Sequence, residues 1–329
     1  MRYGKLGTTD ISISVIAMGC WAFAGGQEWG PQDDEDSIAA VHCAMDSGVN
    51  FFDTAEGYGD GRSESVLGKA LAGRRHKAVI ATKASANHLS RTELPKACER
   101  SLERLNTDYI DLYQIHWPNW EIPISETVEA LDKLRTAGKV RAIGVCNYGM
   151  ADLSDLLTAG HCETDQLPYS LLWRATEYEA LPTCVDNDIG VLCYTPLAQG
   201  LLTGKFASAD AVPTGRARTR HFSKHRPLTR HSQCGFEVET FAAIERIRQM
   251  CCKINATMAE VALAWLLHQR GVTSVLTGAR QAEQIRQNAQ AATLKVPSEI
   301  LDELTQATEE LKLKLGPNVD QYQLSSRIR

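Results

Sequence analysis

The stretch GVNFFDTAEGYGDGRSESVLGKAL, residues 48–71, decides the fold that this sequence predicts. A short apolar run ends at Asp53, and a glycine-rich segment carrying Tyr58 leads into an amphipathic pattern that opens at Ser63. This order predicts a strand, a loop and a helix. Parallel barrels and doubly wound sheets carry their chemistry at the carboxyl ends of such strands. A purely structural role for Asp53, as a cap of the following turn, is equally open at this point.

The same alternation fills the rest of the chain. Apolar runs predict eight strands, each followed by helical spacing of apolar residues, at 14–18, 49–53, 77–82, 111–115, 141–145, 165–169, 190–195 and 272–276. Helices are expected at 34–47, 63–71, 92–105, 125–138, 150–159, 177–188, 236–254, 258–269, 282–290 and 298–313. Eight such units without a linker predict one α/β domain over 1–329, a (β/α)8 TIM barrel.

Two additions and one alternative accompany this prediction. Residues 5–13 predict a β-hairpin at the N-terminal mouth of the barrel, and residues 205–235 form a long irregular segment after the seventh strand. A doubly wound sheet is the alternative, but the glycine-rich phosphate fingerprint that it needs after an early strand is missing.

Composition narrows the class of protein. The chain has 329 residues, 43% of them hydrophobic, and no apolar run approaches the roughly 18 residues of a membrane span. The start, MRYGKLGTTD, lacks a signal peptide's apolar region, so a soluble cytoplasmic protein is expected. The ten cysteines form no CxxC pair, which favours reduced thiols. A net charge of −5 gives no general reason to expect nucleic acid as a partner, and nothing in the sequence fixes an oligomeric state.

Four polar residues are expected to meet at the C-terminal mouth. Asp53, Lys83 and His116 end the second, third and fourth predicted strands, and Tyr58 follows the second. Taken singly, each of these residues can equally be explained as a solvated or hydrogen-bonded structural residue. Together they form one device: the ammonium lowers the phenol's pKa, Asp53 holds the lysine, and His116 orients a carbonyl or shares the proton. Such a site protonates an oxygen as hydride reaches its carbon, which implies a cofactor.

These residues lie in blocks that resemble the aldo-keto reductase superfamily over nearly the whole chain. The blocks are DTAEGYGDGRSESVLGKAL, VIATK, DLYQIHWP, AIGVCN, YTPLAQGLLTGK and TGARQAEQIRQN. The chain looks most like bacterial members with a long loop, such as those encoded beside inositol or sugar catabolic genes. The resemblance implies that Asp53, Tyr58, Lys83 and His116 are the catalytic tetrad of a reversible, NAD(P)H-dependent carbonyl reduction, with Tyr58 as the general acid.

The resemblance also implies a cofactor site. The matching residues are Cys146, Asn147, Gln166 and Tyr194 at the nicotinamide, Leu197, Gly200 and Lys205 at the pyrophosphate, and Gly278, Arg280, Gln284 and Asn288 at the adenosine end. Arg280 is expected to bind a 2′-phosphate, which favours NADP(H), while NAD(H) stays open. Cys146 departs from the family's usual serine and weakens one expected hydrogen bond to the carboxamide.

Three tryptophans are candidates for the wall of the substrate pocket. Trp21 follows the first strand, Trp29 lies in the same loop, and Trp117 follows His116. Flat indole faces suit a sugar ring or an aromatic ketone, so the expected partner is a small carbonyl or alcohol, a sugar- or polyol-derived one included. The alternative is a structural role, in which one or two of these rings cover the end of the barrel.

The loop from Arg216 to Arg230 is rich in arginine and histidine and has no acidic residue. Its cations either meet the cofactor's phosphates or are solvated. Arginines crowded around the histidines argue against zinc, so no metal site is expected. Two other functions remain as alternatives: a cofactor-binding regulatory subunit of the same fold with slow turnover, and a cofactor-free barrel isomerase that uses Lys83 or His116.

Overall fold

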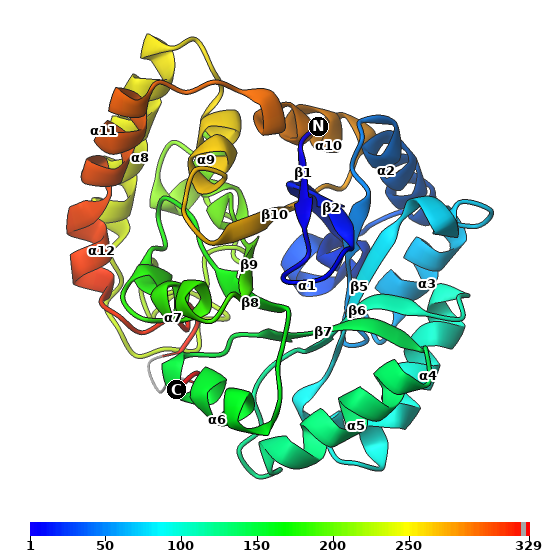
Figure 1. The fold of residues 1–329 in the computed structure, drawn as a ribbon. Coiled ribbons are helices and arrows are strands. Elements are labelled where there is room, and N and C mark those ends of the chain that lie inside the picture. Colours follow the sequence, from blue (N-terminus) through cyan, green and yellow to red (C-terminus); the bar gives the residue numbers. More distant parts are fainter. Residues whose placement is uncertain (324–326) are drawn as a thin grey trace.

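The computed structural model describes residues 1–323 and 327–329 and contains a closed barrel of eight parallel strands (Figure 1). Around the barrel the order is β10-β3-β4-β5-β6-β7-β8-β9. The strands are β3 Ile16–Gly19, β4 Phe51–Asp53, β5 Val79–Ala84, β6 Ile110–Ile115, β7 Val140–Cys146, β8 Thr164–Pro168, β9 Gly190–Tyr194 and β10 Val272–Gly278. All eight strands expected from the sequence are present, and the predicted TIM barrel is confirmed.

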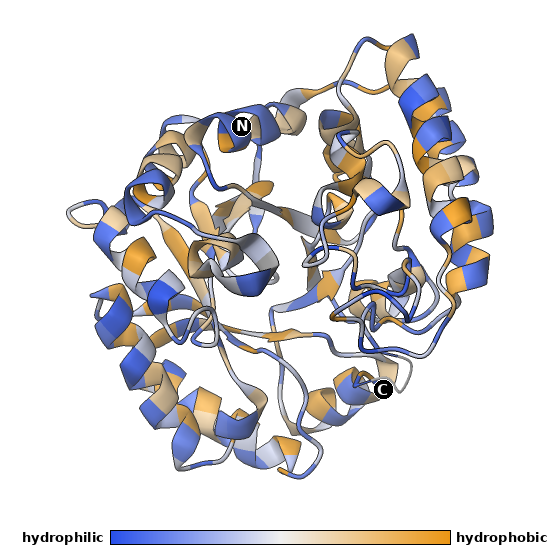
Figure 2. Ribbon diagram, turned by 180° about the vertical axis from the view of Figure 1, so that it is seen from behind, coloured by the Kyte–Doolittle hydropathy of each residue, from blue (hydrophilic) through white to orange (hydrophobic). Residues whose placement is uncertain are grey.

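The helices are α1 Gly26–Trp29, α2 Asp34–Asp46, α3 Arg62–Ala70, α4 Glu93–Leu105, α5 Ile124–Thr136, α6 Met150–Ala159, α7 Ala180–Asp186, α8 Glu237–Lys253, α9 Met258–Leu266, α10 Ala282–Gln290, α11 Ser298–Ala307 and α12 Glu309–Leu315. Most of them form an outer layer, whereas α1, in the loop after β3, lies within the ring in Figure 1. Short 3₁₀ turns join them: η1 Trp21–Ala24, η2 Arg75–Lys77, η3 Ala86–His88, η4 Ala175–Glu177, η5 Ala198–Thr203, η6 Ala209–Ala211 and η7 Ala291–Thr293. Hydrophobic and hydrophilic residues alternate along the helices of the ring, as expected for helices with one face on the barrel (Figure 2).

A small hairpin closes the N-terminal end of the barrel, as the sequence predicts. Strands β1 Tyr3–Lys5 and β2 Ser12–Ser14 pair antiparallel and lie across the barrel opening in Figure 1. Leu6, Ile11 and Ile13 are buried in one cluster with inward-facing residues of the barrel strands, such as Phe51 and Leu112. The hairpin thus keeps water out of the end opposite the carboxyl ends of the strands.

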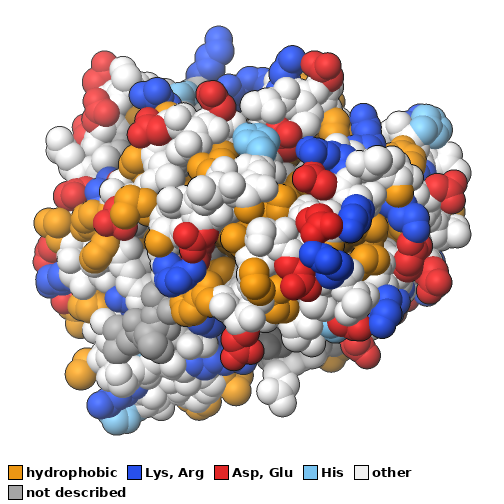
Figure 3. Space-filling view, turned by 60° about the horizontal axis from the view of Figure 1, so that its bottom comes forward, with side chains coloured by type: hydrophobic (Ala, Val, Ile, Leu, Met, Phe, Trp, Pro, Cys, Tyr) orange, Lys and Arg blue, Asp and Glu red, His pale blue; other side chains and the backbone are white. Residues whose placement is uncertain are grey.

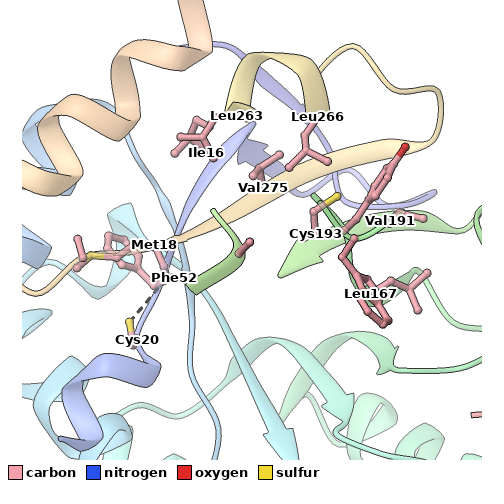
Figure 4. Close-up of a cluster of buried hydrophobic side chains, with 14 of the residues drawn as sticks. Ile16, Met18, Cys20, Phe52, Leu167, Val191, Cys193, Leu263, Leu266 and Val275 are labelled. Carbon is pink, nitrogen blue, oxygen red and sulfur yellow. Dashed lines mark hydrogen bonds between the residues drawn. The ribbon is translucent and has the colours of Figure 1, made fainter. Parts of the chain in front are cut away.

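A second apolar layer joins the barrel to its helices. Figure 4 shows part of it, where Ile16 of β3 and Val275 of β10 lie near Leu263 and Leu266 of α9. Branched side chains fill this layer because a parallel strand covered by helices is buried on both faces. The strand ends above it are therefore held on a rigid frame.

The last predicted helix, residues 298–313, is wrong as one element. The structure has two helices, α11 and α12, separated at Thr308, whose φ of −111° and ψ of 0° are not helical. Arg174 Nη1 donates to the carbonyl of Thr305 at 2.7 Å and to the hydroxyl of Thr308 at 3.1 Å. Arg174, which is distant in the sequence, thus donates to a carbonyl that would accept a hydrogen bond within a continuous helix. The local pattern of apolar residues does not indicate this contact.

Ion pairs and hydrogen bonds hold the long segment between β9 and α8 against the rest of the protein. Arg226 pairs with Asp210 at 2.8 Å and with Glu237 at 3.0 Å, the two acids that bound the acid-free stretch. Arg220, which is 2% exposed, donates to the backbone carbonyls of Leu315 and Asn318. These bonds fix the segment close to the chain between α12 and the C-terminus.

The outer surface mixes both signs of charge. On the face shown in Figure 3, acidic and basic side chains are intermingled. Pairs such as Arg91 with Glu129 and Lys253 with Glu303 are exposed, so each contributes little to stability. Within the described residues, no helix has the length and apolar character that a membrane crossing requires.

Candidate active site

Three strand ends and one loop bring the four predicted polar residues together. Asp53 is the last residue of β4, Lys83 lies in β5, and His116 directly follows β6. Lys83 Nζ lies 2.6 Å from Asp53 Oδ1, 2.7 Å from the Thr54 carbonyl and 3.4 Å from Tyr58 Oη. The lysine is completely buried, so its charge is held by this carboxylate and carbonyl alone at the foot of the phenol.

Two amides complete the surroundings of the Asp53 carboxylate. Its Oδ2 accepts hydrogen bonds from Gln114 Nε2 at 3.2 Å and from Gln166 Nε2 at 2.9 Å. Both glutamines face the barrel interior, on β6 and β8. A buried carboxylate with three donors is fully satisfied, which fixes the direction in which it holds the lysine. Gln114 was not among the predicted site residues; a polar residue at an inward position of a buried strand is the signal for it.

Burial decides the protonation of the phenol and the amine. Burial raises the pKa of Tyr58 to about 12, although the Lys83 charge acts to lower it. Burial alone would lower the pKa of Lys83, but the Asp53 charge and hydrogen bond outweigh it and raise the pKa. The Lys83 charge does act to lower the pKa of Tyr58, as expected, but burial outweighs it and the net shift is upward. At neutral pH the site holds a neutral phenol beside a charged lysine.

His116 lies beside the phenol. The His116 and Tyr58 ring centroids lie 5.7 Å apart, with the rings nearly edge to face. Burial, with the positive charges of Lys83 and Arg327, lowers the pKa of His116 to about 3. The imidazole is therefore neutral at physiological pH and is suited to hydrogen bonding rather than to supplying a proton.

These groups lie at the wall of a cleft of about 940 Å³. Asp53, Tyr58 and His116 line it, whereas Lys83 lies beneath. Ten of the predicted cofactor residues also line it: Asn147, Gln166, Tyr194, Leu197, Gly200, Lys205, Gly278, Arg280, Gln284 and Asn288. A volume of this size is ample for a cofactor or substrate.

Cys146 is the exception. Its thiol is buried, does not line the cleft, and lies 3.6 Å from Gln114 Oε1, to which it donates. The thiol thus belongs to the hydrogen-bonded chain that leads through Gln114 to Asp53. The predicted weakening of its hydrogen bond to a carboxamide stays a prediction, and in this structure the thiol donates to Gln114 on the neighbouring strand.

The end of the cleft beside His116 is built from an amide and a phenol. Tyr194 Oη donates to Asn147 Oδ1 at 2.8 Å, and Asn147 Nδ2 donates to the carbonyl of His116 at 3.1 Å. Asn147 has a φ of 61°, a left-handed conformation that asparagine tolerates. The bonds lock an aromatic ring into the cleft wall, as a surface on which a planar ring can stack.

Farther along, the cleft has the donors that phosphate groups need. Ala198, Gln199 and Gly200 have φ of 45°, 56° and 98°, and this left-handed run turns the chain towards the side chains of Lys205 and Arg216, which supply the donors. A Cβ on Gly200 would lie 3.3 Å from Lys205 Nζ and 3.5 Å from Arg216 Nη1, so glycine leaves room there. Burial and the neighbouring Arg216 lower the pKa of Lys205, the result expected where cations face each other.

A buried donor supports the same fit. The indole Nε1 of Trp29 is buried and finds no hydrogen-bond partner among the described residues. Trp29 lines the cleft, and the guanidinium carbon of Arg216 lies 5.6 Å from its ring centroid. An unpaired donor beside a cation fits an anionic, oxygen-rich ligand such as a dinucleotide, because a buried polar group without a partner otherwise carries a desolvation cost.

Arg280, predicted to bind a 2′-phosphate, already makes three hydrogen bonds within the protein. Its guanidinium donates to Gln32 Oε1 at 2.7 Å, to the Trp29 carbonyl at 2.8 Å and to the carbonyl of Pro31. Arg280 lines the cleft, but these donors join the end of β10 to the loop after β3. A 2′-phosphate would have to replace some of these contacts.

All three predicted tryptophans line the cleft. The Trp21 ring stacks on Tyr58 with 6.0 Å between centroids, and Trp29 meets Trp21 edge on at 5.3 Å. Trp117 lies under the guanidinium of Arg327, 3.7 Å from the ring centroid. Further lining residues that were not predicted as site residues are Arg218, Tyr322 and Arg327. The last two come from the C-terminal segment, where no local pattern marks them.

The sequence is similar to those of known oxidoreductases. Residues 15–309 match the model of the aldo/keto reductase family. The aldo-keto reductase YhdN of Bacillus subtilis is 35% identical over 87% of both chains. The NADH-specific methylglyoxal reductase of Escherichia coli is 35% identical over 94% of this chain and its own full length.

Two solved structures are also similar to this chain. An aldo-keto reductase from Klebsiella pneumoniae in complex with NADPH is 30% identical, with a TM-score of 0.71 over 93% of this chain and 92% of that chain. The glycerol dehydrogenase from Gluconobacter oxydans is 31% identical, with a TM-score of 0.80 over 96% of both chains. The family match spans most of the sequence and includes every strand of the barrel. This chain therefore belongs to the aldo/keto reductase family.

Proposed function

We propose that this oxidoreductase reduces small aldehydes and ketones to alcohols, sugar- or polyol-derived carbonyls among them, with residues 1–329 acting as one domain. The observation that carries the proposal is the buried Lys83 ammonium held between Asp53 Oδ1 at 2.6 Å and Tyr58 Oη at 3.4 Å, on a cleft with phosphate-binding character. A bound nicotinamide cofactor supplies the hydride to the carbonyl carbon. Family membership supports a nicotinamide-dependent carbonyl reduction.

The chain's own residues handle the oxygen. Tyr58 donates its proton to the carbonyl oxygen, and Lys83 stabilises the negative charge that develops on the phenol. Asp53, held by Gln114 and Gln166, keeps the ammonium charged and aimed. His116, as a neutral imidazole, donates a hydrogen bond that orients the same oxygen. With hydride on carbon and this proton on oxygen, the product is an alcohol.

Cofactor oxidation tests the proposal directly. We expect methylglyoxal and a panel of small aldehydes to cause loss of absorbance of the reduced cofactor, and the reduced cofactor to quench fluorescence from the tryptophans of the cleft. Quenching without turnover on any carbonyl would contradict the enzyme and favour a cofactor-binding subunit. The absence of both quenching and turnover would contradict the use of this cofactor altogether.

Arg280 is proposed to favour NADPH over NADH. Replacement by leucine, Arg280→Leu, is expected to weaken NADPH binding by roughly 10- to 100-fold, because a charge-assisted pair with the 2′-phosphate is lost. NADH binding is expected to change much less. Dissociation constants from fluorescence titration of both cofactors measure the effect.

A matched control is Arg286→Gln on α10, the helix that follows Arg280, where Arg286 pairs with Glu283 at the surface. It should leave both dissociation constants at their original values. Equal weakening of NADPH and NADH in Arg280→Leu would show that the arginine acts only by tying down residues 29–32, and would contradict the proposed preference.

A further inference from the structure

Arginines lie against the aromatic end of the cleft. The guanidinium carbon of Arg218 is 5.3 Å from the Trp21 ring centroid and 5.2 Å from that of Tyr322. The residue is only 8% exposed, and it lines the cleft. A largely buried guanidinium between two aromatic faces has few rotamers available, so its orientation is already restricted.

The cleft as a whole carries an excess of positive charge. Among the described residues that line it, the cations are Lys205, Arg216, Arg218, Arg230, Arg280 and Arg327, and the acids are Asp53 and Glu260. Asp53 is paired with Lys83, and the Glu260 carboxylate caps its own helix through Thr257. A cleft of one sign with low-dielectric walls concentrates ligands of the opposite charge.

Position separates Arg218 from the cations proposed to meet the dinucleotide. Lys205 and Arg216 flank Gly200, and Arg280 contacts residues 29–32. Arg218 instead contacts Trp21, whose ring stacks on Tyr58 at 6.0 Å with 27° between the planes. Its guanidinium and the phenol proposed to protonate the substrate therefore contact the same indole ring.

We propose that the carbonyl substrate carries an anionic group, a carboxylate or a phosphate, and that Arg218 binds this group while Tyr58 meets the carbonyl oxygen. The inference rests on the proposed reductase function and adds the charge of its substrate. Arginine binds both anions bidentately through parallel N–H donors. Because Arg218 and Tyr58 contact the same indole, a short linker between the anion and the carbonyl fits best.

Matched substrate pairs test the inference in the full-length protein with reduced cofactor. The carboxylate arm compares 4-carboxybenzaldehyde with its methyl ester, and the phosphate arm compares glycolaldehyde phosphate with glycolaldehyde. We expect kcat/KM for the charged member of at least one pair to exceed that of its partner by about 10-fold or more. The arm with the larger ratio identifies the anion.

Variants locate the source of this preference. Arg218→Gln should bring the ratio close to one, and Arg218→Lys, which keeps the charge but loses the fork, should give an intermediate ratio. Lys224→Gln is the control, because Lys224 is an exposed cation of the same loop that does not line the cleft. It should keep the original ratio.

Several results would overturn the inference. One is a ratio near one for both pairs in the unaltered protein, which needs no variant and leaves carbonyl reduction itself intact. Another is an Arg218→Gln variant that loses both members of a pair equally and binds NADPH more weakly by fluorescence, because Arg218 would then serve the cofactor. Absence of turnover on all four compounds would contradict the reductase function and this inference with it.

Discussion

Replacing Tyr58 with phenylalanine is expected to lower kcat by roughly 10²- to 10⁴-fold, because the ring stays and only the proton donor is lost. The Trp21 ring, 6.0 Å from Tyr58, and the His116 ring, 5.7 Å away, should keep their places. Steady-state kinetics with one aldehyde and the reduced cofactor measure the loss. Fluorescence titration should give an unchanged dissociation constant for the cofactor.

The pH profile provides an independent reading of the same residue. Tyr58 must be protonated to donate, and with its pKa raised to about 12 the donor form persists through neutral and mildly alkaline pH. His116, with a pKa lowered to about 3, stays neutral over the same range. We therefore expect kcat/KM for reduction to show no limb from either residue between about pH 6 and 9, and to fall only as pH rises towards the pKa of Tyr58.

Near-normal kcat in Tyr58→Phe would contradict the assignment of the proton donor. A limb near neutral pH that disappears on replacing His116 with asparagine would show that this imidazole titrates during turnover, against the neutral form described above.

Much of the fold follows from the sequence because its determinants are local. The alternation of short apolar runs with helical spacing places all eight strands, and the hairpin at 5–13 follows from turn residues between two apolar runs. The break between α11 and α12 does not, since Arg174 causes it from a distance of more than one hundred residues along the chain. Periodicity records what a segment prefers, and tertiary hydrogen bonds override it.

The residues of the site likewise divide into those that the local sequence predicts and those that only the folded barrel places. Asp53, Lys83 and His116 can be predicted because each lies at the carboxyl end of a strand, and Tyr58 because it lies in the loop that follows one. The hydrogen bonds of Gln114 and the orientation of Cys146 depend on the register between strands, which only the closed barrel fixes. The engagement of Arg280 with residues 29–32 likewise joins segments far apart in sequence.

Replacing Lys83 with methionine is expected to damage both catalysis and stability. Loss of the ammonium removes the charge that stabilises the developing phenolate, so kcat should fall by roughly 10²- to 10³-fold. It also leaves the Asp53 carboxylate buried at 3% exposure without its counter-ion. Breaking a buried pair from one side typically costs about 3–5 kcal/mol in the free energy of unfolding. Urea denaturation of the single variant, followed by circular dichroism, measures this cost.

The double variant Asp53→Asn with Lys83→Met separates the two effects. With the carboxylate replaced by an amide, no unpaired charge is buried, and most of the lost free energy of unfolding should return, because a removed buried ion pair is often nearly neutral. Activity should stay as low as in Lys83→Met, since the phenol still lacks its cation. Recovery of both would show that Lys83 acts only through folding. Recovery of neither would mean that its bond to the Thr54 carbonyl, at 2.7 Å, matters as much as the ion pair.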